Sequence, residues 1–127
     1  MPTAPKLRLD ARDRAITSAE LALNKKAFDV KVLEIKNLST IADYLVLASG
    51  RTDRQVVAIA DNIRQGLKKF GKAIDIEGLS EGTWVVIDYG DVIVHVFTDE
   101  LRHYYTLDDL WRAAPRLEVA EGVAEKQ

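Results

Sequence analysis

The pair of residues best suited to chemistry is formed by two carboxylates at alternate positions of a short predicted strand, Asp75 and Glu77. Alternate residues of a strand share a face, and two carboxylates held together can bind a divalent metal for phosphoryl transfer. A nucleotidyl transferase would also need a Gly-Ser phosphate loop at a helix start shortly upstream. Here Ser49 and Gly50 stand in the reverse order, and a predicted helix separates them from the acids. The pattern therefore favours a solvated edge-strand face over a metal site.

The remaining reactive side chains do not form a catalytic motif. The sequence has no cysteine, which excludes disulfides, thiolate catalysis and cysteine-ligated zinc. Its two histidines, His95 and His103, have no histidine or cysteine at ligand spacing. No serine has a nucleophile-elbow context, and neither a dinucleotide fingerprint nor a Walker motif is present. We therefore expect no enzyme activity, no cofactor and no metal; the alternative is a residual nucleotidyl transferase that uses Asp75 and Glu77.

The composition is that of a soluble single-domain protein. The chain has 127 residues, 47% hydrophobic and 30% charged, which suits a core built without cross-links. Its net charge of −2 lacks the basic field typical of nucleic-acid binders. We expect the basic cluster of Lys68, Lys69 and Lys72, at a predicted helix end, to complement the helix dipole rather than to contact phosphate. No signal peptide or membrane span is recognisable, so we expect a cytoplasmic protein.

Hydrophobic periodicity predicts elements in the order α-β-β-α-β-β-β-α. Helical spacing of apolar residues predicts helices over 14–26 and 52–71. Apolar runs predict strands over 28–35, 43–49 and 73–77, before the hairpin described below. Thr52 and Gln55 form a capping-box pattern, while Thr98 and Thr106 are expected to cap two short helices before Pro115. These elements predict an α/β (α+β) domain with a mixed β-sheet of about five strands flanked by helices.

The predicted domain covers residues 13–114. Residues 1–12 begin with two prolines and little to bury, which predicts a flexible N-terminal segment. Residues 115–127 are charged and alanine-rich, which predicts a mobile C-terminal tail.

The most informative segment is a predicted hairpin over 84–97. Its turn sequence Asp-Tyr-Gly-Asp, 88–91, contains Gly90, which can adopt positive φ. A loop of two or four residues centred on the Tyr-Gly pair would set Ile87 opposite Val92 and Trp84 opposite His95. A three-residue loop would shift which residues stand opposite one another but would keep the alternation of each strand. Alternation then divides the two strands into two faces.

The two faces of the hairpin differ in composition. One is wholly aliphatic and predicts core; it comprises Val85, Ile87, Val92, Val94 and Val96. The other is mixed and comprises Trp84, Val86, Asp88, Asp91, Ile93, His95 and Phe97. An aromatic anchor with acidic groups at its rim is typical of a protein-binding surface. From composition alone, cover by the N-terminal helix or by Tyr104, Tyr105 and Trp111 is an equal alternative.

The segment Trp84-Val-Val-Ile-Asp-Tyr-Gly-Asp-Val-Ile-Val-His-Val-Phe97 closely resembles the signature of the Iojap family of ribosomal silencing factors. Three further segments resemble parts of the same family in the same order, namely 41–50, 53–61 and 102–111. The resemblance covers roughly residues 15 to 112. It implies a nucleotidyltransferase-like topology whose active site has been lost.

The resemblance also implies a non-catalytic factor. Such a factor binds the large ribosomal subunit through its ribosomal protein number fourteen and sterically blocks joining of the small subunit. Translation is thereby repressed under nutrient limitation or in stationary phase. Contact with rRNA would be secondary at most, and a homodimeric scaffold, formed through the same face when the ribosome is absent, is a further alternative.

The positions that match the family's partner-binding motif are Trp84, Asp88, Gly90, Asp91, His95 and Tyr105. The resemblance suggests Trp84 as the apolar anchor and the two aspartates as acceptors for basic side chains. Gly90 would fix the turn, and His95 would set the Trp84 rotamer or contact the partner. Asp43 and Arg54 also match and are compatible with structural roles.

Overall fold

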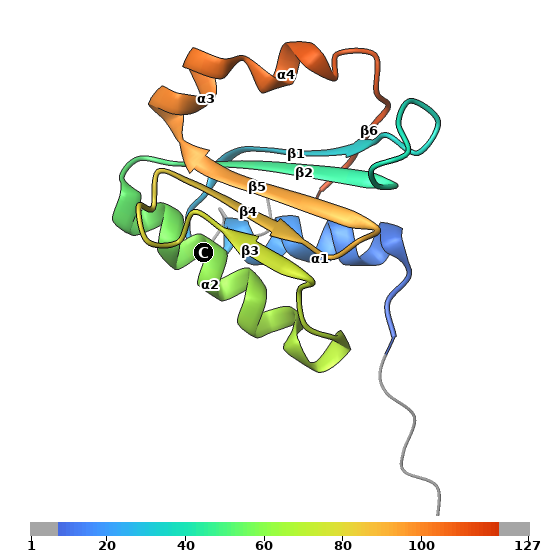
Figure 1. The fold of residues 1–127 in the computed structure, drawn as a ribbon, viewed down its shortest axis with the longest axis horizontal. Coiled ribbons are helices and arrows are strands. Elements are labelled where there is room, and N and C mark those ends of the chain that lie inside the picture. The colour runs from blue at the N-terminus through green and yellow to red at the C-terminus, as the bar shows by residue number, and fades with distance from the viewer. Residues whose placement is uncertain (1–7, 120–127) are drawn as a thin grey trace, which may run out of the picture.

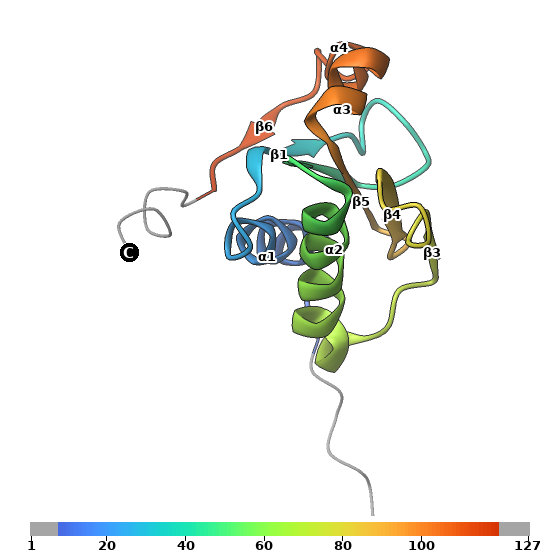
Figure 2. The same ribbon diagram turned by 90° about the vertical axis from the view of Figure 1, so that its left-hand side faces the viewer.

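The computed structural model describes residues 8–119, which form one mixed sheet with helices on both faces (Figures 1 and 2). The strands lie in the order β3-β4-β5-β2-β1-β6. They are β1 (Phe28–Glu34), β2 (Tyr44–Gly50), β3 (Asp75–Glu77), β4 (Trp84–Asp88), β5 (Val92–Thr98) and β6 (Arg116–Leu117). The helices are α1 (Ala11–Leu23), α2 (Asp53–Leu67), the 3₁₀ turn η1 (Lys68–Phe70), α3 (Asp99–Tyr105) and α4 (Leu107–Leu110). The predicted fold class, a mixed sheet flanked by helices, is confirmed.

Strand β2 is the centre of the sheet. Each of its seven residues is buried, as its nearly continuous apolar sequence predicts. It pairs antiparallel with β1 and parallel with β5. Because β2 is buried on both faces, the fold needs a covering layer on each side.

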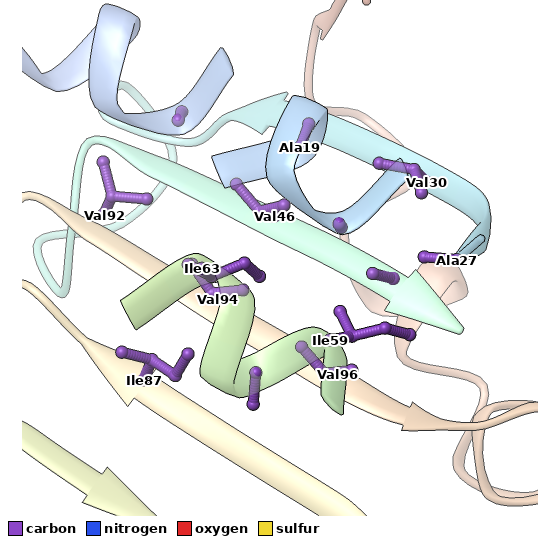
Figure 3. Close-up of a cluster of buried hydrophobic side chains, with 14 of the residues drawn as sticks. Ala19, Ala27, Val30, Val46, Ile59, Ile63, Ile87, Val92, Val94 and Val96 are labelled. Atoms are coloured by element: carbon purple, nitrogen blue, oxygen red, sulfur yellow. The ribbon is translucent and has the colours of Figure 1, made fainter. Parts of the chain in front are cut away.

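Helices α1 and α2 form the layer on the first face (Figure 2). Figure 3 shows Ile59 and Ile63 of α2 lying over Val94 and Val96 of β5, and all four side chains are fully buried. Burial of an aliphatic side chain of this size contributes about 1.5–3 kcal/mol. The predicted cap of α2 is present, since the Thr52 hydroxyl oxygen accepts from the Gln55 N–H at 3.1 Å.

Helices α3 and α4 form the layer on the second face, at the β1–β2 side of the sheet and away from β3 (Figure 1). Beneath them lies a second core of Leu33, Ile35, Ala42, Leu45, Leu47 and Phe97. Phe97, placed on the mixed hairpin face by its alternation, is fully buried here. The C-terminal helices therefore cover part of the mixed face, one of the two alternatives left open by the sequence.

The hairpin has the predicted faces, except that Asp91 faces α1 instead of the mixed face, and its register differs from the predicted one. All five residues of the aliphatic face are fully buried. Trp84, however, stands opposite Phe97 rather than His95, and Ile87 stands opposite Val94 rather than Val92. The turn is centred on Gly90 and Asp91, one residue later than predicted. The Tyr89 N–H donates to the Val92 carbonyl at 2.9 Å and closes the turn, and the Asp88 carboxylate accepts from the Gly90 N–H at 2.7 Å.

Two predicted details of the helices are wrong. Helix α1 starts at Ala11 rather than at residue 14, because the Asp10 carboxylate accepts from the Asp13 N–H at 2.8 Å and caps it. Thr106 has a left-handed backbone (φ 48°) and its side chain makes no cap; its hydroxyl donates to the Tyr105 carbonyl instead.

The segment predicted as a C-terminal tail contains a short strand. Residues 116 and 117 form β6, which pairs with β1 and raises the strand count from about five to six. Backbone pairing, which needs no apolar pattern, accounts for this strand. The rest of that segment beyond residue 119, like residues 1–7, lies outside the described residues.

Two glycines with positive φ offer a test of how tightly β4 is placed. A Cβ on Gly78 (φ 92°) would lie 1.9 Å from the Trp84 carbonyl oxygen, whereas one on Gly71 (φ 125°) would meet nothing within 4 Å. We expect Gly71→Ala to cost about 1–2 kcal/mol from backbone strain alone. Gly78→Ala should cost about 2 kcal/mol more, because the start of β4 must move. Urea denaturation measures both; equal losses would contradict the close approach.

Candidate functional site: a half-open sheet face

Trp84 lies at the junction between the covered and uncovered parts of the second sheet face. Its ring centroid is 5.6 Å from that of Phe97 and 5.1 Å from that of Tyr105. Its indole N–H donates to Nδ1 of His95 at 3.0 Å. Trp84, His95 and Tyr105, which lie far apart in sequence, are thus brought together by the sheet and α3.

His95 is held in its neutral form by this environment. Burial lowers its pKa from 6.5 to about 4. Its Nδ1 is occupied by the Trp84 N–H, so the ring accepts at that atom and orients the indole. This geometry fits the predicted role of His95 in setting the Trp84 rotamer.

Asp88, Gly90 and Asp91 lie at the opposite end of the hairpin. One oxygen of Asp88 caps the turn at Gly90, whose φ is 89°. Asp91 faces α1, where its Oδ1 lies 3.2 Å from Nε of Arg14. These two buried atoms lack hydrogen-bond geometry, so the contact is chiefly electrostatic. The six predicted residues therefore form two groups, one at each end of the hairpin.

A buried arginine near the site was missed by the sequence reasoning. Arg102 of α3 is 5% exposed, and its guanidinium donates two hydrogen bonds to Asp108, at 3.0 and 2.9 Å. It also donates to the Ser49 hydroxyl at 2.8 Å and to the carbonyl of Asp29. Lys31 pairs with the same Asp108 carboxylate at 2.6 Å.

The Arg102 network ties α3 and α4 to strands β1 and β2. The hydrogen bonds from Arg102, together with Lys31, hold the pKa of Asp108 well below its usual range. The sequence shows Arg102 in the family-like Arg-x-Tyr-Tyr segment, but no local pattern links it to Ser49 or Asp29, which are 53 and 73 residues away. Only the tertiary fold brings these groups together.

Asp75 and Glu77 lie on the uncovered part of this sheet face. Asp75 stands opposite Asp88, and Glu77 stands opposite Val86. Both acids are exposed, as predicted for an edge strand. We call the residues of β3, β4 and β5 on this side the open face; they are Asp75, Glu77, Trp84, Val86, Asp88, Ile93 and His95.

Within residues 8–119 no three acidic or histidine side chains gather closely enough to hold a metal ion. In the same part of the chain, none of the helices has the length and apolarity needed to cross a bilayer.

The family model described as ribosomal silencing factor during starvation matches residues 8–127. The chain belongs to this family. A ribosomal silencing factor from Halalkalibacterium halodurans is 42% identical over 109 residues, covering 82% of this chain and 92% of that protein. One from Bacillus subtilis is 39% identical over 101 residues, covering 79% and 86%.

The fold of this family member also matches a solved structure. A crystal structure of a protein from Chromobacterium violaceum superposes with a TM-score of 0.79 at 29% identity, covering 88% of this chain and 93% of that chain. The family assigned from the 84–97 motif is therefore confirmed.

The neutral, buried His95 predicts an acid-sensitive stability. Between pH 6.5 and 4 the unfolded chain binds a proton at His95 that the folded chain does not, so stability falls as the pH falls through this window. The loss should reach up to about 3 kcal/mol at pH 4. Chemical denaturation at pH 7 and pH 4.5 measures it. His95→Asn, which keeps an acceptor and cannot titrate, should remove most of this pH dependence of stability. His103→Asn, at an exposed site, is the control. If His103→Asn removed the pH dependence and His95→Asn did not, His95 would not be its source.

The Arg102 network predicts that substitution of Asp108 lowers the stability of the fold much more than substitution of the adjacent Asp109. Asp108→Asn should cost about 2–4 kcal/mol, because the buried guanidinium loses its counter-charge. Asp109→Asn, at the adjacent exposed position with no ion pair in the described structure, should change stability by less than about 0.5 kcal/mol. Urea denaturation at pH 7 compares them, and similar losses would show that the network is not a stabilising element.

Proposed function

We propose that the chain is a ribosomal silencing factor that binds the large ribosomal subunit through its ribosomal protein number fourteen. By occupying that surface it blocks joining of the small subunit and represses translation under nutrient limitation or in stationary phase. The observation that carries this proposal is an open face, apolar at its centre and acidic at its edge, in a member of the silencing factor family.

The open face has the composition of a docking surface. Trp84, Val86 and Ile93 are each half-buried, so apolar surface is left for a partner to cover. Tyr104 and Tyr105 extend this surface from α3, with exposures of 76% and 51%. Aromatic residues of this kind supply much of the binding energy in protein interfaces.

The acidic edge of the open face indicates a basic partner. Asp75, Glu77 and Asp88 form no ion pair with any residue in 8–119. Asp75 and Asp88 also stand directly opposite each other, an arrangement of like charges that destabilises an isolated sheet. A basic surface docked here would neutralise both, and ribosomal proteins, which bind RNA, are commonly basic.

The motif residues take distinct parts in this proposal. Trp84 and Tyr105 contact the partner, and His95 positions the indole. Asp88 offers the carboxylate oxygen that does not cap the turn. Asp91 and Gly90 act indirectly, since Asp91 is paired with Arg14 and Gly90 shapes the turn.

A catalytic role finds less support than docking. Asp75 and Glu77 lie on an exposed sheet surface without a third ligand among the described residues. The relatives are named silencing factors, a name that indicates regulation rather than catalysis. We infer a soluble, cytoplasmic, non-enzymatic regulator.

A charge placed in the open face tests the proposal. Val86→Lys should weaken co-sedimentation with purified large subunits by at least about tenfold and restore subunit joining, because it sets a cation against a basic partner. Ala58→Lys adds the same charge on the exposed side of α2 and should leave both measurements unchanged. Circular dichroism confirms that both variants are folded.

Two outcomes would overturn the proposal. Wild-type protein that fails to bind large subunits would remove it altogether. If instead Val86→Lys turns a dimer into a monomer while binding to the large ribosomal subunit persists, the open face would be a self-association surface. The hypothesis of a homodimeric scaffold would then replace that of docking.

A further inference from the structure

A basic hollow lies on the other side of the molecule from the open face, at the carboxyl end of α2. It has a volume of about 290 Å³ and is lined by Arg64, Gln65, Lys68, Lys72, Ile76 and Tyr89, among others. Since a water molecule occupies about 30 Å³ in the liquid, the hollow can admit a group the size of a phosphate. Figure 1 shows this end of α2 running into η1 and then into β3.

The backbone brings the basic residues of this hollow together from three positions. Arg64 and Lys68 are one turn apart at the end of α2. Gly71 (φ 125°) then reverses the chain, so that Lys72 returns to line the same hollow. The Ile74 N–H donates to the Asp88 carbonyl at 2.7 Å and fixes this segment beside the hairpin turn.

The positive charge in the hollow is only partly neutralised within the described structure. Arg64 pairs with Asp61 at 3.2 Å, and Asp61 is itself 54% exposed. Lys68 and Lys72 form no ion pair with any residue in 8–119. Two uncompensated ammonium groups therefore face a hollow in a chain whose net charge is −2.

Complementation of the helix dipole does not account for the whole arrangement. The end of α2 carries roughly half a negative charge, which Lys68 alone can offset. Lys72 lies beyond η1, outside the last helical turn, where the dipole effect has faded. The partial charge opposes anion binding, but the full charges of Arg64, Lys68 and Lys72 outweigh it.

Tyr89 adds a feature that favours nucleic acid over an acidic peptide. Its half-buried ring lines the hollow, and the Arg14 guanidinium lies 5.4 Å from its centroid. Burial raises the pKa of Tyr89, against the opposing effect of Arg14 and Arg64, so the phenol stays protonated and can donate. Cations beside an aromatic ring are the combination that binds the backbone and bases of unpaired RNA.

We propose that this hollow binds a phosphodiester group of ribosomal RNA, through Lys68, Lys72 and Arg64, as a second contact to the large subunit. The identity of the RNA rests on the proposed function; the anion site itself does not. The basic hollow and the open face lie on different sides of the sheet, so the factor would contact protein with one and RNA with the other.

Salt dependence of large-subunit binding tests this second contact. Removing two lysines that contact phosphate should reduce the magnitude of the slope of log affinity against log salt by about 1–2. We expect this for Lys68→Ala/Lys72→Ala, together with about tenfold weaker binding at low salt. The matched control Lys25→Ala/Lys36→Ala gives the same net charge of −4 (−2 less two lysines). Lys25 lies beside the start of α2, roughly 20 Å along the helix from the hollow.

A second measurement does not depend on the ribosome. Titration of the free chain with a short single-stranded RNA at low salt should shift the amide NMR signals of Lys68, Gly71 and Lys72. The double variant Lys68→Ala/Lys72→Ala should lose these shifts, while Val86→Lys should keep them. A free phosphate site is distinguished by inorganic phosphate at matched ionic strength, which should produce no comparable shift.

The outcomes separate the two proposals. Subunit binding with an unchanged salt slope in the double variant, or RNA shifts located elsewhere, would overturn the RNA contact and leave the silencing function intact. A chain that binds RNA at the hollow but not large subunits would overturn the silencing function and the ribosomal identity of the RNA, and would leave the anion site itself intact. Equal shifts with inorganic phosphate would replace RNA by free phosphate as the ligand.

Discussion

Burial of strand β2 on both faces is the constraint on which the rest of the fold depends. Every residue from Tyr44 to Gly50 is buried, and the parallel pairing of β2 with β5 sets the central register of the sheet. A strand that is apolar on both sides cannot face water, so each face requires a layer of helices. Helices α1 and α2 supply the first layer and the shorter α3 and α4 supply the second.

The second layer is small, and this has two consequences. Two short helices bury little apolar surface, so their position depends on polar contacts from Arg102 to Asp108, Ser49 and Asp29. A buried guanidinium is costly unless it is fully paired, and this requirement gives the layer one defined position. The layer also reaches β4 only at Trp84 and stops short of β3, which leaves the open face exposed. The small size of this helical layer therefore accounts for both the buried network and the exposed surface that we propose for docking.

The distribution of charge fits two different contacts. The net charge of −2 conceals an acidic edge on β3 and β4 and a basic hollow at the end of α2. A large ribosomal subunit presents both basic proteins and anionic RNA, and a factor with separated charges of opposite sign can meet both. Electrostatic complementarity of this kind determines orientation and rate more than affinity. The apolar centre of the open face, around Trp84 and Val86, would supply most of the binding energy.

The helices and strands from α1 to α4, except η1, the aliphatic core face of the hairpin and the family could all be predicted from the sequence alone. These depend on local information: apolar period, the Thr52 cap and the continuous motif from 84 to 97. The sequence also showed that Trp84, His95 and Tyr105 match the family motif, although it did not show that these residues contact one another. The predicted hairpin register was wrong because the position of the turn depends on local hydrogen bonds, such as the one between the Asp88 carboxylate and the Gly90 N–H, which the composition does not reveal.

The tertiary fold determines which residues share a surface. It separated Asp91 from Trp84, placed Asp75 beside Asp88, and joined Arg102 to groups up to 73 residues away. Strand β6 likewise exists because β1 offers an unpaired edge, not because its own two residues favour a strand. Such contacts depend on the order of strands in the sheet, which pairs distant segments and leaves no periodic trace in the sequence.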